Sequence, residues 1–177
     1  MKSIFVRVLL AFLLLIGIAL VVGSLLPRGY DLSSEMTINA PPEKIFPHLN
    51  SLKKWNGWSP WNPGDNPEID VEYGQTVEGV DANLRWSDAR GKGKVWITKS
   101  EPNEAIEYSL LFGPYPEMAS QISLTSLSEN KTQVKWTSQG ELPSGPFYGI
   151  AGGMMFKDGM ESEYMRALAK LKTIAEK

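Results

Sequence analysis

Between Ile69 and Ser138 the chain carries six short segments with the residue pattern of β-strands. Each is bounded by Gly, Pro, Asn or Asp, which are the residues that form turns. Consecutive strands joined by short links pair antiparallel, and alternating apolar residues give their sheet one face that has to be buried. The predicted strands are Ile69–Tyr73, Asn83–Trp86, Lys94–Lys99, Ala105–Phe112, Met118–Leu127 and Gln133–Ser138.

The cover for that face is predicted at the C-terminus. A helix from about Phe156 to Ala175 has apolar residues on one stripe and charged residues on the other. The apolar stripe consists of Met160, Tyr164, Leu168 and Leu171.

The segment before the sheet adds one strand and two short helices. Tyr30–Asn39 alternates as a half-buried strand, and the Pro-Pro-Glu sequence at Pro41 is typical of a helix start. A second short helix is expected near Leu52–Trp55. The predicted fold is therefore α+β, with a curved antiparallel sheet of about seven strands wrapped around one long C-terminal helix.

The N-terminal run from Val8 to Leu26 contains no charged residue. At about 1.5 Å per residue it is long enough to cross a hydrocarbon layer of about 30 Å, so we expect a transmembrane helix. Lys2 and Arg7 favour a cytoplasmic N-terminus, which places the domain on the extracytoplasmic, periplasmic side of a single-pass protein. The alternative is a signal peptide cleaved near Gly23, which would release a secreted domain. The expected parts are an anchor over residues 1–28 and one domain over residues 29–177.

Composition argues against several classes of function. The formal net charge is −2 and there is no cysteine, so the chain lacks the basic stripe of nucleic-acid binders and any thiolate metal site. His48 is the single histidine, and the scattered carboxylates form no metal-ligand pattern. We therefore expect no nucleic-acid partner, no metal and no cofactor. His48 is either a base at a pocket mouth or a partly exposed helix residue.

Several local motifs resemble a known family. The segment Met36-Thr37-Ile38-Asn39-Ala40-Pro41-Pro42-Glu43 is similar to the opening strand and helix of the SRPBCC superfamily, and Trp55-Asn56-Gly57-Trp58-Ser59-Pro60-Trp61 is similar to its tryptophan motif. Gly91-Lys92-Gly93, Pro102-Asn103-Glu104 and Gly140-Glu141-Leu142-Pro143 resemble bacterial members labelled polyketide cyclase. The resemblance covers nearly all of residues 30–176.

This resemblance implies the helix-grip fold shared by START lipid-transfer domains, the birch-pollen-allergen group and polyketide cyclases. It does not imply a reaction, because the superfamily places carriers, receptors, chaperone partners and a minority of enzymes on one scaffold.

Large aromatic and Met side chains mark the candidate site. Strand alternation points Trp86, Tyr108, Phe112, Met118 and Trp136 toward the space between sheet and helix. They either fill a core or line a cavity for an apolar ligand. The Gly-, Pro- and Met-rich segment 143–159 is a candidate lid. The complete predicted ligand-binding set is Trp58, Trp61, Trp86, Tyr108, Phe112, Met118, Trp136, Phe147, Met154 and Tyr164.

Three functions follow from these observations. The leading hypothesis is a membrane-anchored domain that binds a hydrophobic small molecule or lipid without converting it. The second is an enzyme of the cyclase or dehydratase type, using Tyr108, Tyr164 or His48 to direct a proton. The third is an envelope protein-interaction module that contacts a protein partner through Trp96, which has the opposite parity to Val95 and Ile97, and through the Trp-rich loop.

Overall fold

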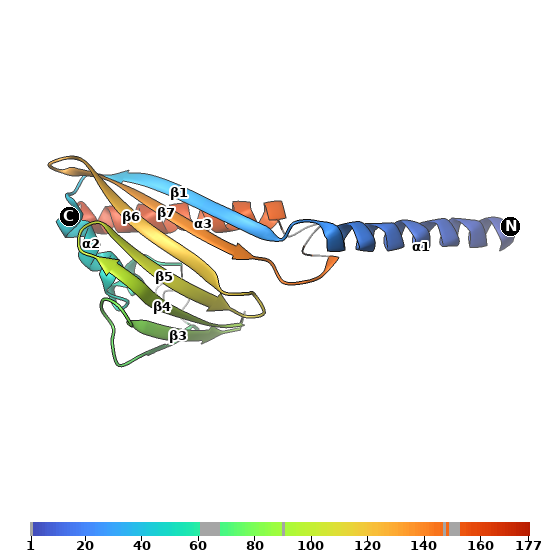
Figure 1. Ribbon diagram of the computed structural model, residues 1–177, viewed down its shortest axis with the longest axis horizontal. Coiled ribbons are helices and arrows are strands. Elements are labelled where there is room, and N and C mark those ends of the chain that lie inside the picture. Colours follow the sequence, from blue (N-terminus) through green and yellow to red (C-terminus); the bar gives the residue numbers. More distant parts are fainter. Residues whose placement is uncertain (1, 61–67, 90, 147, 149–152) are drawn as a thin grey trace.

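A computed structural model describes residues 2–60, 68–89, 91–146, 148 and 153–177. Figure 1 shows a long N-terminal helix joined to one domain. The elements are helix α1 (Lys2–Leu25), strand β1 (Gly29–Ile38), helix α2 (Pro42–Asn50), the 3₁₀ helix η1 (Lys54–Gly57), strands β2 (Asp70–Tyr73), β3 (Asn83–Asp88), β4 (Gly91–Glu101), β5 (Ala105–Phe112), β6 (Met118–Ser128) and β7 (Lys131–Glu141), and helix α3 (Gly153–Ala175).

The seven strands form one antiparallel sheet in the order β1-β7-β6-β5-β4-β3-β2. Every neighbouring pair from β2 to β7 is also consecutive in the chain, whereas β1 pairs with β7, from Gly29 opposite Glu141 to Ile38 opposite Thr132. The predicted α+β helix-grip architecture is confirmed. We call the end of the sheet where β1 begins the proximal end, because it adjoins α1, and the opposite end the distal end (Figure 1).

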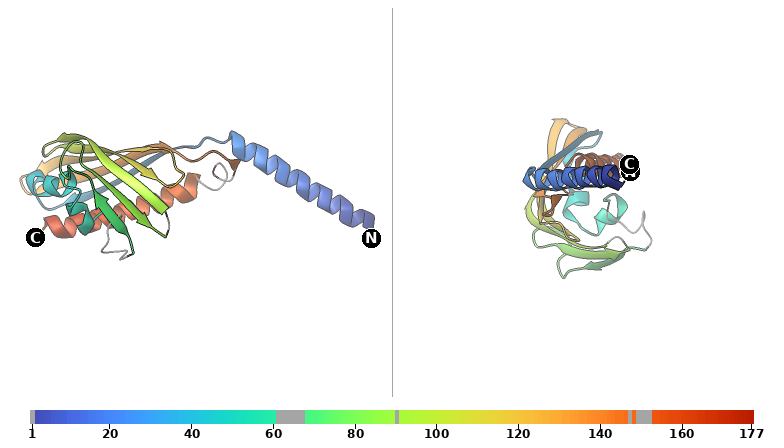
Figure 2. Two further views of the ribbon diagram at one scale, coloured as in Figure 1. Left: turned by 90° about the horizontal axis from the view of Figure 1, so that it is seen from below. Right: turned by 90° about the vertical axis from the view of Figure 1, so that its right-hand side faces the viewer.

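Three helical elements cover the concave face of this sheet. Helix α3 runs beside β1 with its N-terminus at the proximal end, while α2 and η1 lie at the distal end (Figure 2). The apolar stripe predicted for α3 faces the interior, since Tyr164, Leu168 and Leu171 are fully buried and Met160 is partly buried against the core. The distal half of the interior is therefore closed by α2 and η1, and the proximal half is not.

Several element boundaries differ from the expectations. Strand β4 begins at Gly91 rather than Lys94, and α3 begins at Gly153 rather than Phe156. The second short helix covers Lys54–Gly57 as a 3₁₀ turn, in which the Trp58 N–H donates to the Trp55 carbonyl at 3.1 Å. Short 3₁₀ turns of this kind leave no periodic pattern in the sequence.

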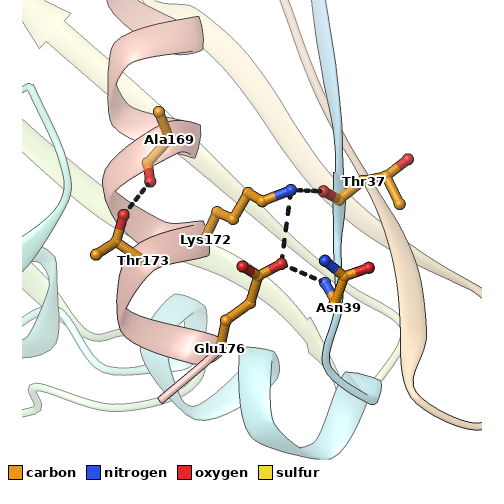
Figure 3. A network of polar contacts seen from close by, with 6 residues as sticks. All are labelled: Thr37, Asn39, Ala169, Lys172, Thr173 and Glu176. Carbon is orange, nitrogen blue, oxygen red and sulfur yellow. Dashed lines mark hydrogen bonds and ion pairs between the residues drawn. The ribbon is translucent and has the colours of Figure 1, made fainter.

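Polar contacts fasten the C-terminal end of α3 to the distal end of β1 (Figure 3). The Lys172 ammonium donates to the Thr37 carbonyl at 2.9 Å, and a Glu176 carboxylate oxygen accepts from the Asn39 N–H at 2.6 Å. Lys172 and Glu176 also pair with each other at 3.5 Å. These contacts lower the pKa of Glu176, chiefly because the Asn39 N–H stabilises the carboxylate.

Helix α1 contains a candidate membrane span at Ile4–Leu25, whose most apolar 18-residue window has a mean hydropathy of 3.0 and contains no buried residue. By length and composition it is able to cross a bilayer or to act as a signal sequence. Residues 26–28 join it to β1, and this link is held to the domain. The Leu142 N–H donates to the Arg28 carbonyl at 2.8 Å, and the Arg28 guanidinium donates to Ser144 Oγ at 2.9 Å.

Candidate ligand pocket

The distal half of the interior is filled by an aromatic core made of Trp55, Trp58, Tyr108, Trp136 and Tyr164. All five side chains are essentially inaccessible to solvent. The Trp136 ring stacks on Tyr164 with 4.0 Å between centroids and meets Trp58 edge-on at 5.7 Å. Tyr108 meets Trp55 edge-on at 5.1 Å. Rings packed at these separations leave no room for a ligand among them.

Hydrogen bonds satisfy the polar atoms of the aromatic core. Trp136 Nε1–H donates to the Tyr108 hydroxyl at 2.8 Å, and the Tyr164 hydroxyl lies 2.8 Å from Ser138 Oγ, which in turn lies 2.7 Å from Ser120 Oγ. Burial raises the pKa of both tyrosine hydroxyls well above the usual range. Both therefore stay protonated at neutral pH and act as fixed hydrogen-bonding groups within the core.

The proximal half of the interior contains a pocket of about 380 Å³. It lies between the ends of β1, β3, β5 and β6 and the first turns of α3. Most of its lining is aromatic or aliphatic, and the full set is Tyr30, Pro60, Trp86, Asp88, Leu110, Phe112, Tyr115, Pro116, Met118, Phe156, Met160 and Glu163. A pocket of this size and character is typical of small-molecule sites.

A row of rings forms the pocket wall. The distances between the centroids of successive rings are 6.2 Å for Trp86 and Phe112, 6.2 Å for Phe112 and Tyr115, 5.6 Å for Tyr115 and Phe156, and 4.7 Å for Phe156 and Tyr30. The row crosses from the β3 side of the sheet to β1, with Phe156 of α3 as the link. The wall is therefore built from elements far apart in the chain.

Two glycines allow the end rings of this row to lie flat on the sheet. Trp86 is paired across the strands with Gly93, and Tyr30 with Gly140. A Cβ at Gly93 would overlap the Trp86 ring, and one at Gly140 would overlap the Tyr30 ring and hydroxyl. The missing Cβ at each glycine therefore allows these two pocket-wall rings to pack against the paired strand.

The pocket also contains polar groups. Asp88 Oδ1 accepts from the Gly91 N–H at 3.1 Å, and Glu163 pairs with Arg166 at 2.9 Å. Burial, followed by the neighbouring Tyr115, raises the pKa of the Tyr30 hydroxyl to about 12. Within the described residues, no group of three or more His, Cys, Asp and Glu is arranged to hold a metal ion.

Two other predicted residues lie away from the pocket. His48 is half-buried in α2, where its carbonyl accepts from Trp58 Nε1–H, and burial followed by Lys54 lowers the pKa of its imidazole. Trp96 lies on the outer face of the sheet with the Lys94 ammonium 4.8 Å from its ring, while Val95 and Ile97 are buried.

The predicted ligand-binding residues that the structure describes separate into two groups. Trp86, Phe112 and Met118 line the pocket, whereas Trp58, Tyr108, Trp136 and Tyr164 belong to the aromatic core. Trp61, Phe147 and the Met154 side chain lie outside the described residues. Sequence reasoning placed Phe156 in the candidate lid. It did not assign the remaining lining residues to the site, namely Tyr30, Pro60, Asp88, Leu110, Tyr115, Pro116, Met160 and Glu163.

Strand alternation identified the face of the sheet but not the position along each strand. Tyr108 precedes Phe112 by four residues, which at about 3.4 Å per residue places it roughly 13 Å further toward the distal end. The same spacing separates Trp136 from Gly140, the partner of Tyr30. Closeness to the proximal end of each strand was the available signal for the missed residues.

The sequence profile of the family described as "Polyketide cyclase / dehydrase and lipid transport" matches residues 30–176. The chain belongs to this family. Its matched region begins at Tyr30, a pocket residue, and runs to the end of α3. No curated protein matches the sequence.

Solved structures share the family fold at low identity. The Zhui aromatase/cyclase from Streptomyces sp. R1128 is 15% identical with a TM-score of 0.65, covering 84% of this chain and 94% of its own. A protein of unknown function from Staphylococcus aureus is 9% identical with a TM-score of 0.68, covering 85% and 95%. A protein from Chromobacterium violaceum is 16% identical with a TM-score of 0.60, covering 83% and 97%. At these identities the likeness concerns the fold.

Proposed function

We propose that this family member binds one hydrophobic small molecule or lipid in the proximal pocket and does not convert it. The observation that carries the proposal is an apolar pocket of about 380 Å³ lying next to a core that is already filled. The family description, which includes lipid transport, supports the same ligand class. Replacing water by a hydrophobic ligand in a preformed apolar pocket is favourable, because apolar surface is removed from water.

The test uses two methionines on the same helix. Met160 lines the pocket, whereas Met165 is 41% exposed. Met160→Trp places a large side chain in the pocket, and Met165→Trp adds the same side chain to the outer surface. The full chain is produced in cells, purified in detergent and extracted with organic solvent, and the extract is examined by mass spectrometry.

We expect a bound apolar molecule from the native chain and from Met165→Trp, and a yield from Met160→Trp that is lower by at least about tenfold, because the added ring occupies the pocket. Equal yields from both variants, or an empty native protein, would refute the proposal. Thermal melting of each variant checks that the fold is retained.

The second candidate function is enzymatic, and a specific observation favours it. Asp88 and Glu163 bring two carboxylates to the pocket, and such groups are able to act as general acid and base if a substrate reaches them. The Asp88→Asn and Glu163→Gln variants separate the candidates. A binding protein yields the same extracted molecule from both variants, while an enzyme yields its unreacted substrate, differing in mass from the native extract.

Membrane attachment is a further part of the proposal. We expect α1 to remain in the mature protein as an anchor, with the domain outside the cytoplasm. Intact mass of the membrane-purified protein tests retention, because cleavage near Gly23 would remove most of α1. Protease added to spheroplasts tests the orientation, since only an extracytoplasmic domain is degraded without lysis.

A further inference from the structure

The pocket and the end of α1 lie at the same end of the domain. Tyr30, a wall residue of the pocket, follows Leu25, the last residue of α1, by only five positions. Even a fully extended chain of that length spans at most about 18 Å. Figure 2 shows the N-terminal end of α3, which carries Phe156 and Met160, on this same side of the domain.

The length of α1 sets where this end lies relative to a bilayer. The 22 residues of Ile4–Leu25 rise about 33 Å as a helix, close to the 30 Å thickness of the hydrocarbon layer. Leu25 therefore reaches the edge of the hydrocarbon when Ile4 lies at the opposite edge. The headgroup layer beyond it is only about 5–7 Å thick, so the proximal end of the domain borders the leaflet surface.

The link between α1 and the domain is not a free tether. Arg28 is bound through its carbonyl to Leu142 and through its guanidinium to Ser144. These contacts fasten the link to the end of β7, beside the pocket wall at Tyr30. With so few free residues, the domain cannot readily turn its distal end toward the membrane.

The pocket chemistry matches the interior of the adjacent leaflet. Its lining is dominated by rings, prolines, Leu110 and two methionines, and thioethers adapt to flexible apolar shapes. Its volume of about 380 Å³ is at the small end of the range for ligand pockets, roughly 300–1,000 Å³, which favours one chain over a whole two-chain lipid. A hydrocarbon chain that moves directly from leaflet to pocket avoids exposure to water.

We infer that the pocket takes one hydrocarbon chain of a membrane lipid directly from the leaflet that borders the proximal end. This inference rests on the proposed binding function and anchor. It adds the source of the ligand and the route by which it enters. The bilayer supplies the chain, and α1 holds the pocket where the chain is available.

Photochemical cross-linking tests this route. The full chain is reconstituted in liposomes of phosphatidylethanolamine and phosphatidylglycerol containing a trace phospholipid with a diazirine at the end of one acyl chain. Irradiation is followed by mass-spectrometric mapping of labelled residues. We expect labels on α1 and on the pocket residues Phe156 and Met160. We expect none at Leu127, which is exposed at the distal end.

Two variants and a second probe sharpen the result. Met160→Trp is expected to abolish the label on α3 and keep the label on α1. A spacer of about 16 Gly and Ser residues inserted between Leu26 and Pro27 gives the domain about 20–24 Å of slack, and we expect it to reduce the α3 label several-fold. A diazirine fatty acid added from water on albumin reports binding that does not depend on the bilayer.

The outcomes separate the two proposals. If only the water-borne fatty acid labels α3, the proposed binding function stands and direct entry from the leaflet is overturned. If neither probe labels α3, both are overturned. An unlabelled α1 would overturn the anchor and with it the route, and an undiminished α3 label in the spacer variant would overturn the role of the short link.

Discussion

Trp136 provides the most demanding test of the filled distal interior. Its side chain is completely buried, stacks on Tyr164 at 4.0 Å and donates to the Tyr108 hydroxyl at 2.8 Å. Trp136→Phe removes that hydrogen bond, at a cost of about 1 kcal/mol. Replacing the indole by the smaller phenyl ring also leaves unfilled space. Because the phenyl ring still fills part of the site, we take about half of the usual cost of truncating a buried aromatic to Ala, which adds roughly 2 kcal/mol. The expected total is about 3 kcal/mol.

A loss of this size lowers the melting temperature of a domain this long by about 6–12 °C. The free energy of unfolding is measured by urea unfolding of the full chain in detergent, with far-ultraviolet circular dichroism as the signal. Trp96→Phe is the matched control, because Trp96 lies on the outer face under Lys94, and we expect it to cost about 0.5 kcal/mol. A loss below about 1 kcal/mol for Trp136→Phe, or equal losses for both variants, would refute the filled interior.

Three further predictions concern other parts of the domain. Gly159→Ala is expected to stabilise α3 by about 0.5–1 kcal/mol, because a Cβ there meets no atom within 4 Å and Ala favours helix; a lower urea midpoint would contradict this. The Asn39 N–H lowers the pKa of Glu176 in the folded state. The ionised carboxylate therefore stabilises the fold above the unfolded pKa near 4.5, and this stabilisation is lost as the pH falls from that value through the lower folded pKa. Glu176→Gln should flatten this part of the dependence of melting temperature on pH, and an unchanged profile would count against the contact. Tyr164→Phe removes the hydroxyl bound to Ser138 and should cost about 1 kcal/mol in urea unfolding while the yield of extracted ligand stays the same; lost ligand would instead place Tyr164 in the binding site.

The fold was predictable because it depends on periodicity. The alternation in Tyr30–Asn39 and Ala105–Phe112 and the helical stripe through Tyr164, Leu168 and Leu171 are local patterns, and the structure confirms the elements they indicate. The strand order could be predicted from the resemblance to the family and from the short links between consecutive strands. The 3₁₀ turn at Lys54–Gly57 was displaced from its expected position because it depends on a single tight turn.

The site was harder to predict from the sequence than the fold. A pocket depends on how far along its strand each residue lies, as well as on which face of the sheet its side chain occupies. Trp86 and Trp136 look alike in the sequence, each an inward-facing indole within a strand. Trp86 lies beside Gly93 near a strand end and lines the pocket, whereas Trp136 lies mid-strand against Tyr164 and Trp58. Alternation alone does not distinguish the two, and the sequence signal that does is the distance from the strand end, because α2 and η1 close only the distal half.

The pairing of β1 with β7 has a consequence for how the chain folds as it is synthesised. β1 is made directly after α1, but its one neighbour in the sheet follows roughly a hundred residues later. Closing such a long loop is slow and costs entropy, so the first strand waits unpaired while the others form hairpins behind it. Until β7 arrives, β1 presents an open edge of the kind that pairs with other chains, and this interval is when the protein is most exposed to aggregation.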